Sequence, residues 1–271
     1  MPSELKIGTR GSQLALYQAN WVKDQLGKAH PDLHLTLIKI KTTGDKIQNV
    51  PLAKIGGKGL FVKEIEESLL QKKIDLAVHS IKDVPTEFPP GLHLSAITKR
   101  EDPRDVFISR DGRTLKTLPQ GAKIGTSSLR RQAQLLHFRN DFELIPLRGN
   151  LDTRLKKLRT MNLDGIVLAL AGVRRLGLEE KVTEIIPEDI SLPAIGQGAL
   201  GIETRMDDKE VEGQIRFLND RDSSISVTAE RAFLKKLEGG CQVPLAAYAR
   251  PAGRTLHVDG LVGSIDGKRL I

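Results

Sequence analysis

The stretch "LKIGTRGSQLALYQANWVKDQL", residues 5–26, joins a strand-like segment to a helix-like segment through a short turn. Residues 5–10 form the strand-like part. The helix-like part carries apolar side chains at the spacing of one helical face, namely Leu14, Tyr17, Trp21 and Leu26. An alternating, strand-like segment, "LHLTLIKIK" (33–41), comes next. A strand, a helix and a second strand in this order predict two parallel strands covered by the helix.

The same alternation continues along the chain. A glycine-rich loop, "AKIGGKGLF" (53–61), leads into a helix and then into the buried-looking strand "IDLAVHS" (74–80). The apolar residues that share one face of that helix are Val62, Ile65 and Leu69. The loop lacks the full spacing of a phosphate-binding loop. We therefore interpret it as a flap, with Lys54, Lys58 and Phe61 available to close over a ligand.

A second set of strands and helices follows the charged, proline-containing segment "KREDPRD" (99–105), which we interpret as a linker or hinge. Two segments each place a strand before a helix, "AKIGTSSLRRQAQLLHF" and "FELIPLRGNLDTRLKKL", and "DGIVLALAGVRRLG" adds a third buried strand. Another strand lies within residues 190–205. Its periodicity does not fix the sheet to which it belongs, and one option is a return to the first sheet. The remainder begins with a helix over 226–240 and ends with a hairpin-like segment over 254–271.

These patterns predict an α/β protein with two domains that have mainly parallel, helix-covered sheets, and a small α+β third domain. We expect the first domain to be discontinuous and to comprise residues 1–98 and 194–216. The second domain is expected over 99–193 and the third over 217–271.

Composition and charge narrow the classes of function. The chain has 271 residues, a net charge of +8 and a pI near 9.5, which indicate an anionic partner. An aromatic content of 4% argues against the stacking platforms of single-strand nucleic-acid binders. The first residues show no signal-peptide pattern, and no segment approaches about 18 consecutive apolar residues. A cytoplasmic protein without a membrane partner is therefore expected.

Cys241, in "LEGGCQVPLAAY" (237–248), is the only cysteine of the chain. A single cysteine excludes an intramolecular disulfide and a cysteine-rich zinc site, and no metal is expected. The thiol is then inert and buried, reactive, or a point of attachment. Gly239, Gly240 and Pro244 place it on a loop, where it can point toward a ligand.

Basic and hydroxyl side chains recur where the predicted strands end. In open parallel sheets, ligands bind outside the carboxyl ends of the strands, so these positions predict a shared anion site. Its candidate residues are Arg10, Ser12, Ser80, Lys82, Thr126, Ser127, Ser128, Arg130, Arg131, Arg148, Arg154 and Arg175. For "GTSSLRR" alone, a simple helix cap with exposed arginines explains the residues about equally well.

One acid stands among these cations. Asp83, in "HSIKDVPT", follows a buried strand and precedes Val84 and Pro85, which restrict the local backbone. This position makes Asp83 the leading candidate for acid–base or cation-stabilising work, although a turn former or a partner of Lys82 would look the same. The adjacent His79 alternates within an apolar strand and is more typical of a satisfied core histidine.

Eight motifs together resemble the porphobilinogen deaminase family, also called hydroxymethylbilane synthase. They are "GTRGSQLAL", "GGKGLFVKEIE", "AVHSIKDVPT", "EDPRD", "GTSSLRRQAQL", "LRGN..TRL", "LPAIGQGALGIE" and "EGGCQVP". The resemblance extends from about residue 5 to residue 262. It implies two domains like those of periplasmic binding proteins with a cleft between them, and a third domain that carries the cysteine.

The resemblance also implies a covalent cofactor and a reaction. A dipyrromethane cofactor would be attached to Cys241 through a thioether. Four porphobilinogen units would be added to it with loss of ammonia, and hydrolysis would release a linear tetrapyrrole. Because each pyrrole carries an acetate and a propionate, the growing product is a polyanion. Porphobilinogen and its oligomers are then the partners, without nucleic acid, and a monomer is expected.

Several site residues follow from the resemblance. The family's catalytic aspartate falls on Asp83, and Gln197 joins the strand-end residues named above as a contact of cofactor or substrate. Lys54, Lys58 and Phe61 fall on the family's flexible loop. The family usually continues past residue 271 with a further helix and strand, so we expect either a shortened chain or an incomplete third domain.

Two functions from other classes fit parts of the pattern. A non-catalytic anion-binding protein of the periplasmic type would explain the basic strand ends, but not Cys241 in its motif. A nucleic-acid-binding protein would explain the pI alone, and its binding would fall steeply with salt without any need for the cysteine.

Overall fold

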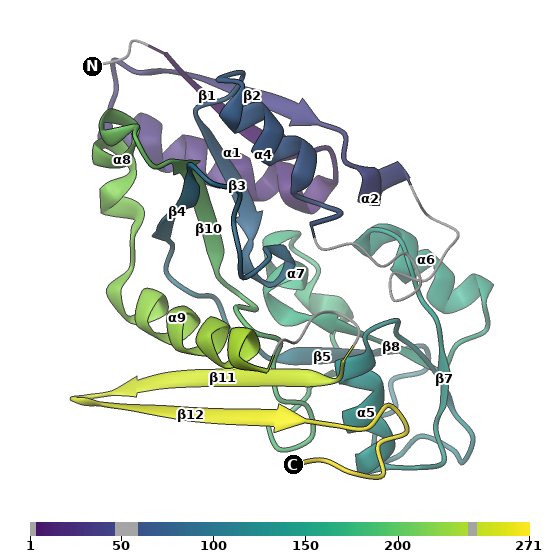
Figure 1. Cartoon of the computed structure of the whole chain (residues 1–271). Coiled ribbons are helices and arrows are strands. Elements are labelled where there is room, and N and C mark those ends of the chain that lie inside the picture. The colour runs from purple at the N-terminus through teal and green to yellow at the C-terminus, as the bar shows by residue number, and fades with distance from the viewer. Residues whose placement is uncertain (1–3, 47–58, 238–242) are drawn as a thin grey trace. The chain divides into compact units, whose positions relative to one another are not determined.

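The computed structural model describes residues 4–46, 59–237 and 243–271 (Figure 1). The described residues form two compact units. The first contains those up to residue 101 together with 199–228, and the second contains 102–198 together with 229–271. The three domain boundaries expected from the sequence stay a prediction.

The first unit holds a five-stranded sheet in the order β2-β1-β3-β10-β4. Its strands are β1 (Glu4–Arg10), β2 (His34–Ile40), β3 (Leu76–Ser80), β4 (Leu92–Ile97) and β10 (Leu200–Arg205). Strand β1 pairs in parallel with β2 and β3, whereas β10 runs antiparallel to β3 and β4. The strand expected within 190–205 therefore does return to the first sheet.

Helices cover both faces of this sheet. On one face lie α1 (Gln13–Ala29) and α8 (Lys209–Ile215), and on the other lies α4 (Lys63–Leu70). The unit also contains the short helix α2 (Thr43–Lys46) and the 3-10 turns η1 (Ile81–Asp83) and η3 (Arg216–Leu218). Successive side chains of a strand point to opposite faces. Leu76 and Val78 accordingly pack in the core that contains α1 and α8, while Ala77 packs in the core that contains α4.

The buried face of α1 differs from the one expected. Its buried residues are Gln18, Ala19, Val22 and Leu26, whereas Tyr17 is 45% and Trp21 36% exposed. Gln18, Val22 and Leu26 follow at intervals of four residues, so the buried stripe lies one position beyond Tyr17 and Trp21. The polar Gln18 occupies part of this stripe. By contrast, the three apolar residues expected along α4 are buried: Val62, Ile65 and Leu69.

The second unit holds a sheet of the same plan, in the order β7-β6-β8-β5-β9. Its strands are β5 (Asp105–Ser109), β6 (Lys123–Gly125), β7 (Glu143–Ile145), β8 (Gly165–Ala169) and β9 (Glu184–Ile185). Here β6 pairs in parallel with β7 and β8, and β5 runs antiparallel to β8 and β9. Two mainly parallel sheets confirm this part of the expected fold class.

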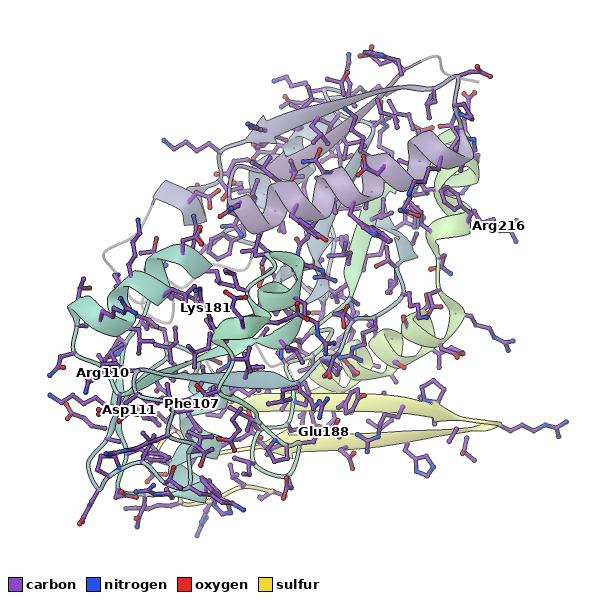
Figure 2. All side chains as sticks on the ribbon, turned by 180° about the vertical axis from the view of Figure 1, so that it is seen from behind. Phe107, Arg110, Asp111, Lys181, Glu188 and Arg216 are labelled. Carbon is purple, nitrogen blue, oxygen red and sulfur yellow. The ribbon has the colours of Figure 1, made fainter. Side chains whose placement is uncertain are left out.

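The helical elements of this sheet are α5 (Leu129–Phe138), α6 (Leu151–Thr160), α7 (Leu170–Arg175) and the turn η2 (Glu179–Lys181). Val106 and Ile108 pack in the core with α6 and α7, and Phe107 packs on the other face with α5. Phe107 is fully buried, while Arg110 and Asp111, just beyond β5, are exposed (Figure 2).

The C-terminal part adds α9 (Arg221–Lys236) and an antiparallel pair, β11 (Leu245–Ala252) and β12 (Thr255–Val262). This small α+β part confirms the rest of the expected fold class. The helix begins at Arg221, before the expected residue 226. The hairpin-like segment expected within 254–271 is confirmed only at its end, where Gly263 bridges Leu270 and Val262 exchanges two backbone hydrogen bonds of 2.9 Å with Ile271. The main partner of β12 is the preceding β11. Alanine and Pro251 in β11 hid its strand character, since both are disfavoured in strands.

Candidate active site

One pocket of the first unit brings together five of the residues singled out in the sequence. Its lining includes Arg10, Ser12, Phe61, Ser80 and Asp83. The parallel pairing of β1 and β3 explains part of this, because the carboxyl ends of both strands then lie at one edge of the sheet. Arg10 is the last residue of β1 and Ser80 the last of β3, while Ser12 caps α1 by accepting a hydrogen bond from the Ala15 N–H at 3.3 Å.

The Arg10 guanidinium is held on two sides. It donates to the carboxylate of Asp45 through Nη2, with a longer contact from Nε at 3.4 Å. The Phe61 ring lies against it, with 4.2 Å between Cζ and the ring centroid. Burial raises the pKa of Asp45, but hydrogen bonds and charge from Arg10, with help from Thr42, outweigh burial and keep that pKa below its ordinary value. Asp45 had no place among the predicted site residues.

Asp83 ends the turn η1 directly after β3, and its side chain is exposed. The Val84 N–H donates to the Ile81 carbonyl at 3.0 Å, and both of these apolar residues are buried, so the short turn is anchored from beneath. Ser80 is held by Gln18, whose Nε2 lies 2.9 Å from the Ser80 hydroxyl. Lys82, which lies between Ser80 and Asp83 in the chain, is exposed.

His79 also reaches this pocket, but its ring is 5% exposed and has a buried partner. Its Nε2 lies 2.8 Å from Oε2 of Glu203 on the neighbouring strand β10, and Glu203 is fully buried. The interpretation of His79 as a satisfied core histidine is confirmed. The sequence did not indicate its partner, because the two residues are far apart along the chain.

In the second unit, Thr126, Ser127 and Ser128 form the turn from β6 into α5. Ser128 is the N-cap, and its hydroxyl accepts from the Arg131 N–H at 3.5 Å. The Thr126 hydroxyl accepts from the Ser128 N–H at 3.2 Å, and the Ser127 hydroxyl donates to the Leu147 carbonyl at 3.0 Å. The expected capping role of these hydroxyls is therefore present, whereas ligand binding by this turn stays a prediction.

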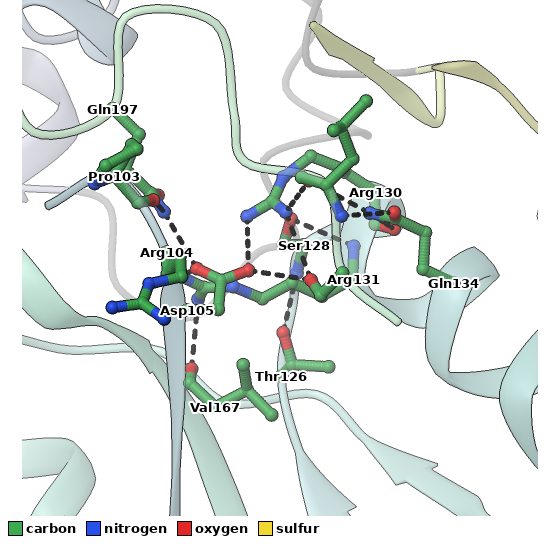
Figure 3. A network of polar contacts seen from close by, with 12 residues as sticks. Pro103, Arg104, Asp105, Thr126, Ser128, Arg130, Arg131, Gln134, Val167 and Gln197 are labelled. Carbon is green, nitrogen blue, oxygen red and sulfur yellow. Dashed lines mark hydrogen bonds and ion pairs between the residues drawn. The ribbon is translucent and has the colours of Figure 1, made fainter. Parts of the chain in front are cut away.

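Arg130, Arg131 and Gln197 meet around Asp105, the first residue of β5 (Figure 3). Both arginine side chains are almost fully buried, so the alternative of exposed arginines behind a helix cap is wrong. Asp105 is fully buried too, although the sequence placed it in a charged linker. The residues next to Asp105 in the chain do not indicate this burial, because its arginine partners come 25 and 26 residues later.

The other three arginines are half-buried and lie on or near α6 and α7. Arg148 follows β7, and its carbonyl accepts from the Lys157 ammonium at 3.1 Å. Arg154 donates through Nε to the Gly149 carbonyl at 2.8 Å. Arg175 donates through Nη2 to the Gly198 carbonyl at 2.7 Å.

Some predicted residues lie outside the described ones. These are Lys54 and Lys58 of the expected flap and Cys241, the expected attachment point. Across the described ranges, no group of three or more histidine, cysteine, aspartate or glutamate residues is placed to hold a metal ion. No helix in the same ranges combines the length and the apolar character that a membrane span requires.

Family models match both parts of the chain. Residues 5–213 match the dipyrromethane cofactor binding domain of porphobilinogen deaminase, and residues 224–271 match the C-terminal domain of the same enzyme. The chain belongs to the porphobilinogen deaminase family. The resemblance noted from its eight motifs is thus confirmed, and the first of these matches makes dipyrromethane the cofactor of the family to which the chain belongs.

Relatives of the porphobilinogen deaminase family match almost the whole chain. A porphobilinogen deaminase of Geobacter sulfurreducens is 59% identical, over 99% of this chain and 84% of the relative. One of Citrifermentans bemidjiense is 60% identical, over 98% of this chain and 83% of the relative.

Two of the solved structures that match this chain are bacterial proteins. The periplasmic aliphatic sulphonate binding protein SsuA of Escherichia coli is 14% identical over 88% of this chain and 71% of its own, with a TM-score of 0.45. The periplasmic VFT2 domain of Bordetella pertussis BvgS is 10% identical over 86% of this chain and 93% of its own, with a TM-score of 0.47. The fold class rests on the strand orders described above.

Proposed function

We propose that this chain is a hydroxymethylbilane synthase. It joins four porphobilinogen molecules head to tail, with loss of ammonia, on a dipyrromethane primer and releases hydroxymethylbilane by hydrolysis. The observation that carries this proposal is the match of residues 5–213 to the family's cofactor-binding domain. When bound, the dipyrromethane supplies the pyrrole position to which the first substrate unit is joined.

Asp83 is the proposed catalytic residue. Asp83 lines the pocket that is also lined by Arg10 and Ser80. A carboxylate there stabilises the positive charge that develops on a pyrrole as ammonia leaves, and it can accept or return a proton. A short, anchored turn suits this work, because a preorganised charge needs no reorganisation during the reaction.

The cations are proposed to hold the carboxylates of cofactor and substrate. The second unit fits a carboxylate ligand, because Arg130 and Arg131 are 6% and 7% exposed and share the single carboxylate of Asp105. One positive charge is left over in this cluster. In addition, Nε of Arg131 has no hydrogen-bond partner among the described residues. The other proposed binding residues are Arg10, Ser12, Ser80, Lys82, Thr126, Ser127, Ser128, Arg148, Arg154, Arg175 and Gln197.

Cys241 is the proposed point of attachment, supported by its being the only cysteine of the chain. Phe61 and the two lysines of the expected flap are proposed to close over the ligand. We further propose a cytoplasmic monomer that needs no metal, with the three domains at the boundaries expected from the sequence.

An intact-mass spectrum tests the proposed function. The purified protein is expected to be heavier than its sequence by one dipyrromethane unit, and Cys241→Ser is expected to remove this increment. Incubation with porphobilinogen should then yield hydroxymethylbilane only with the wild-type protein. An unmodified mass in fully active protein would overturn the assignment of the cofactor.

A further inference from the structure

Asp105 occupies an unusual electrostatic position. Its carboxylate is fully buried and accepts four hydrogen bonds from four side chains. Oδ1 accepts from Arg131 Nη2 at 2.7 Å and from Gln197 Nε2 at 2.9 Å. Oδ2 accepts from Arg130 Nη2 at 2.8 Å and from the Ser191 hydroxyl at 2.9 Å. Both oxygens are therefore saturated by protein donors, and Asp105 itself has no capacity left for a ligand.

The charges of this cluster do not balance. Burial raises the pKa of Asp105, but the charges of Arg130 and Arg131 outweigh burial and hold that pKa well below its usual range. The carboxylate is thus ionised at neutral pH and neutralises only one of the two guanidinium groups. Burial also lowers the pKa of Arg130, against the opposing effect of Asp105. A buried surplus of one positive charge is costly unless an anion compensates it.

Each guanidinium is fixed from a second side as well. Arg130 Nη1 donates to the Leu192 carbonyl at 2.6 Å, and Arg131 Nη1 donates to the Val167 carbonyl at 2.9 Å. With one nitrogen on Asp105 and another on a backbone carbonyl, the plane of each group is set. Figure 3 shows both arginines converging on the carboxylate from α5.

The strand fixes the position of the carboxylate in turn. Asp105 pairs with Ala169 across β5 and β8, and its carbonyl accepts from the Ile186 N–H at 2.9 Å. Its side chain is therefore placed by the sheet, whereas the arginines sit on the first turn of α5. The Asp105 carboxylate is the point at which the helix and the loop of Gln197 are tied to the strand.

We infer that Asp105 is a positioning residue, which orients the Arg130 and Arg131 guanidinium groups so that their surplus positive charge is presented to a carboxylate of the pyrrole chain. This inference rests on the proposed function. It adds a residue that does not touch the ligand and acts only through the arginines. A purely structural ion pair would change stability alone, whereas a positioning residue also changes ligand affinity.

The test compares Asp105→Asn and Asp105→Glu with the wild-type protein. Asn removes the charge, and Glu keeps the charge but moves it by one methylene. Both are expected to lower the fraction of chains that carry the cofactor, read by intact mass. In the loaded chains, the KM for porphobilinogen should rise on the order of ten-fold, while kcat changes less. Ser191→Ala removes one hydrogen bond to Asp105 and no charge, so it should fold and give a smaller change in the same direction.

Asp164→Asn is the matched control. Asp164 lies in the same unit, is paired with Arg110 at 3.0 Å and accepts from the Lys123 N–H at 2.8 Å, but it belongs to no part of the proposed site. The Asp164→Asn variant should lose some thermal stability, but its cofactor loading and its KM for porphobilinogen should be unchanged. Wild-type loading and KM in the folded Asp105 and Ser191 variants would overturn the inference. A wild-type protein without the mass increment would instead overturn the proposed function, so the two failures are distinguishable.

Discussion

The Phe61 ring lies against the guanidinium of Arg10, with 4.2 Å between Cζ and the ring centroid. Nε and Nη2 of the same guanidinium donate to the carboxylate of Asp45. Gly44 makes room for this ring, because a Cβ at that position would lie 2.2 Å from a ring carbon. Arg10 is thus oriented by an anion and an aromatic face before any ligand arrives. Preorganisation of this kind lowers the entropy lost on binding.

Asp45→Asn should therefore weaken binding more than turnover. Loss of the carboxylate frees the Arg10 side chain, so the KM for porphobilinogen should rise about three- to ten-fold with little change in kcat. Asp141→Asn is a close control, because the Asp141–Arg139 pair in the second unit is 23% and 22% exposed against 23% and 21% for Asp45 and Arg10. Equal effects of the two substitutions on KM would contradict the role given to Asp45.

Asp83→Asn separates binding from chemistry. The amide keeps the size of the side chain but loses the charge that acts on the developing cation. We expect a folded protein that can still carry preassembled cofactor and turns over on the order of 100-fold or more slowly. Asp83→Glu should retain more activity than the amide. Single-turnover release of ammonia, with loading checked by mass, measures this. Turnover of loaded Asp83→Asn protein within a few-fold of wild type would make Asp83 a turn residue only.

Arg131→Leu should block cofactor loading or early elongation, because a neutral side chain cannot replace a charge-assisted hydrogen bond to a carboxylate. The same change removes the uncompensated positive charge around Asp105. The variant can therefore lose cofactor loading without losing stability. Mass spectrometry and thermal unfolding of one preparation separate the two. Arg110→Leu, which removes an ion pair with Asp164 elsewhere in the unit, should load normally. Normal loading and elongation by Arg131→Leu would disprove the predicted contact.

Glu66 should make the stability of the fold depend on pH. Burial, followed by the negative charge of Glu203, raises the pKa of Glu66 from 4.5 to about 7, although His79 opposes this and Glu67 adds to it. Between these two values the folded state holds a proton that the unfolded state releases. Stability should consequently fall as pH rises through this window, by at most about 3 kcal/mol.

Urea unfolding at pH 5 and pH 8 measures the effect. Glu66→Gln cannot ionise, and it should lose less stability than the wild-type protein between these two conditions. An identical decline in both proteins would show that Glu66 does not titrate in this range.

Periodicity and turn residues predicted the fold class and most of the helices and strands, because burial along one element repeats at a fixed spacing. They did not predict the strands β4, β5, β9 and β11. The rule for parallel sheets likewise placed Arg10, Ser80 and Asp83 at a common edge before the structure showed them around one pocket. These features depend on short stretches of chain or on a general rule of topology.

The partners of the charged residues could not be predicted in this way. Arg10 and Asp45 are separated by 35 positions, and His79 and Glu203 by 124. Which acid meets which base depends on strand order and on the course of the loops, neither of which leaves a local signal. For the same reason Asp105 looked like part of a charged linker, although its side chain is fully buried.

The strand order of the first sheet has a consequence for synthesis on the ribosome. β3 and β4 are not neighbours, because β10 lies between them and is made about a hundred residues later. Until then both strands carry open edges, which favour incorrect pairing with other chains. All five strands of the second sheet fall within residues 105–185, so this sheet can close while the first is still incomplete. A nascent chain that stalls before residue 200 is therefore the form most exposed to aggregation.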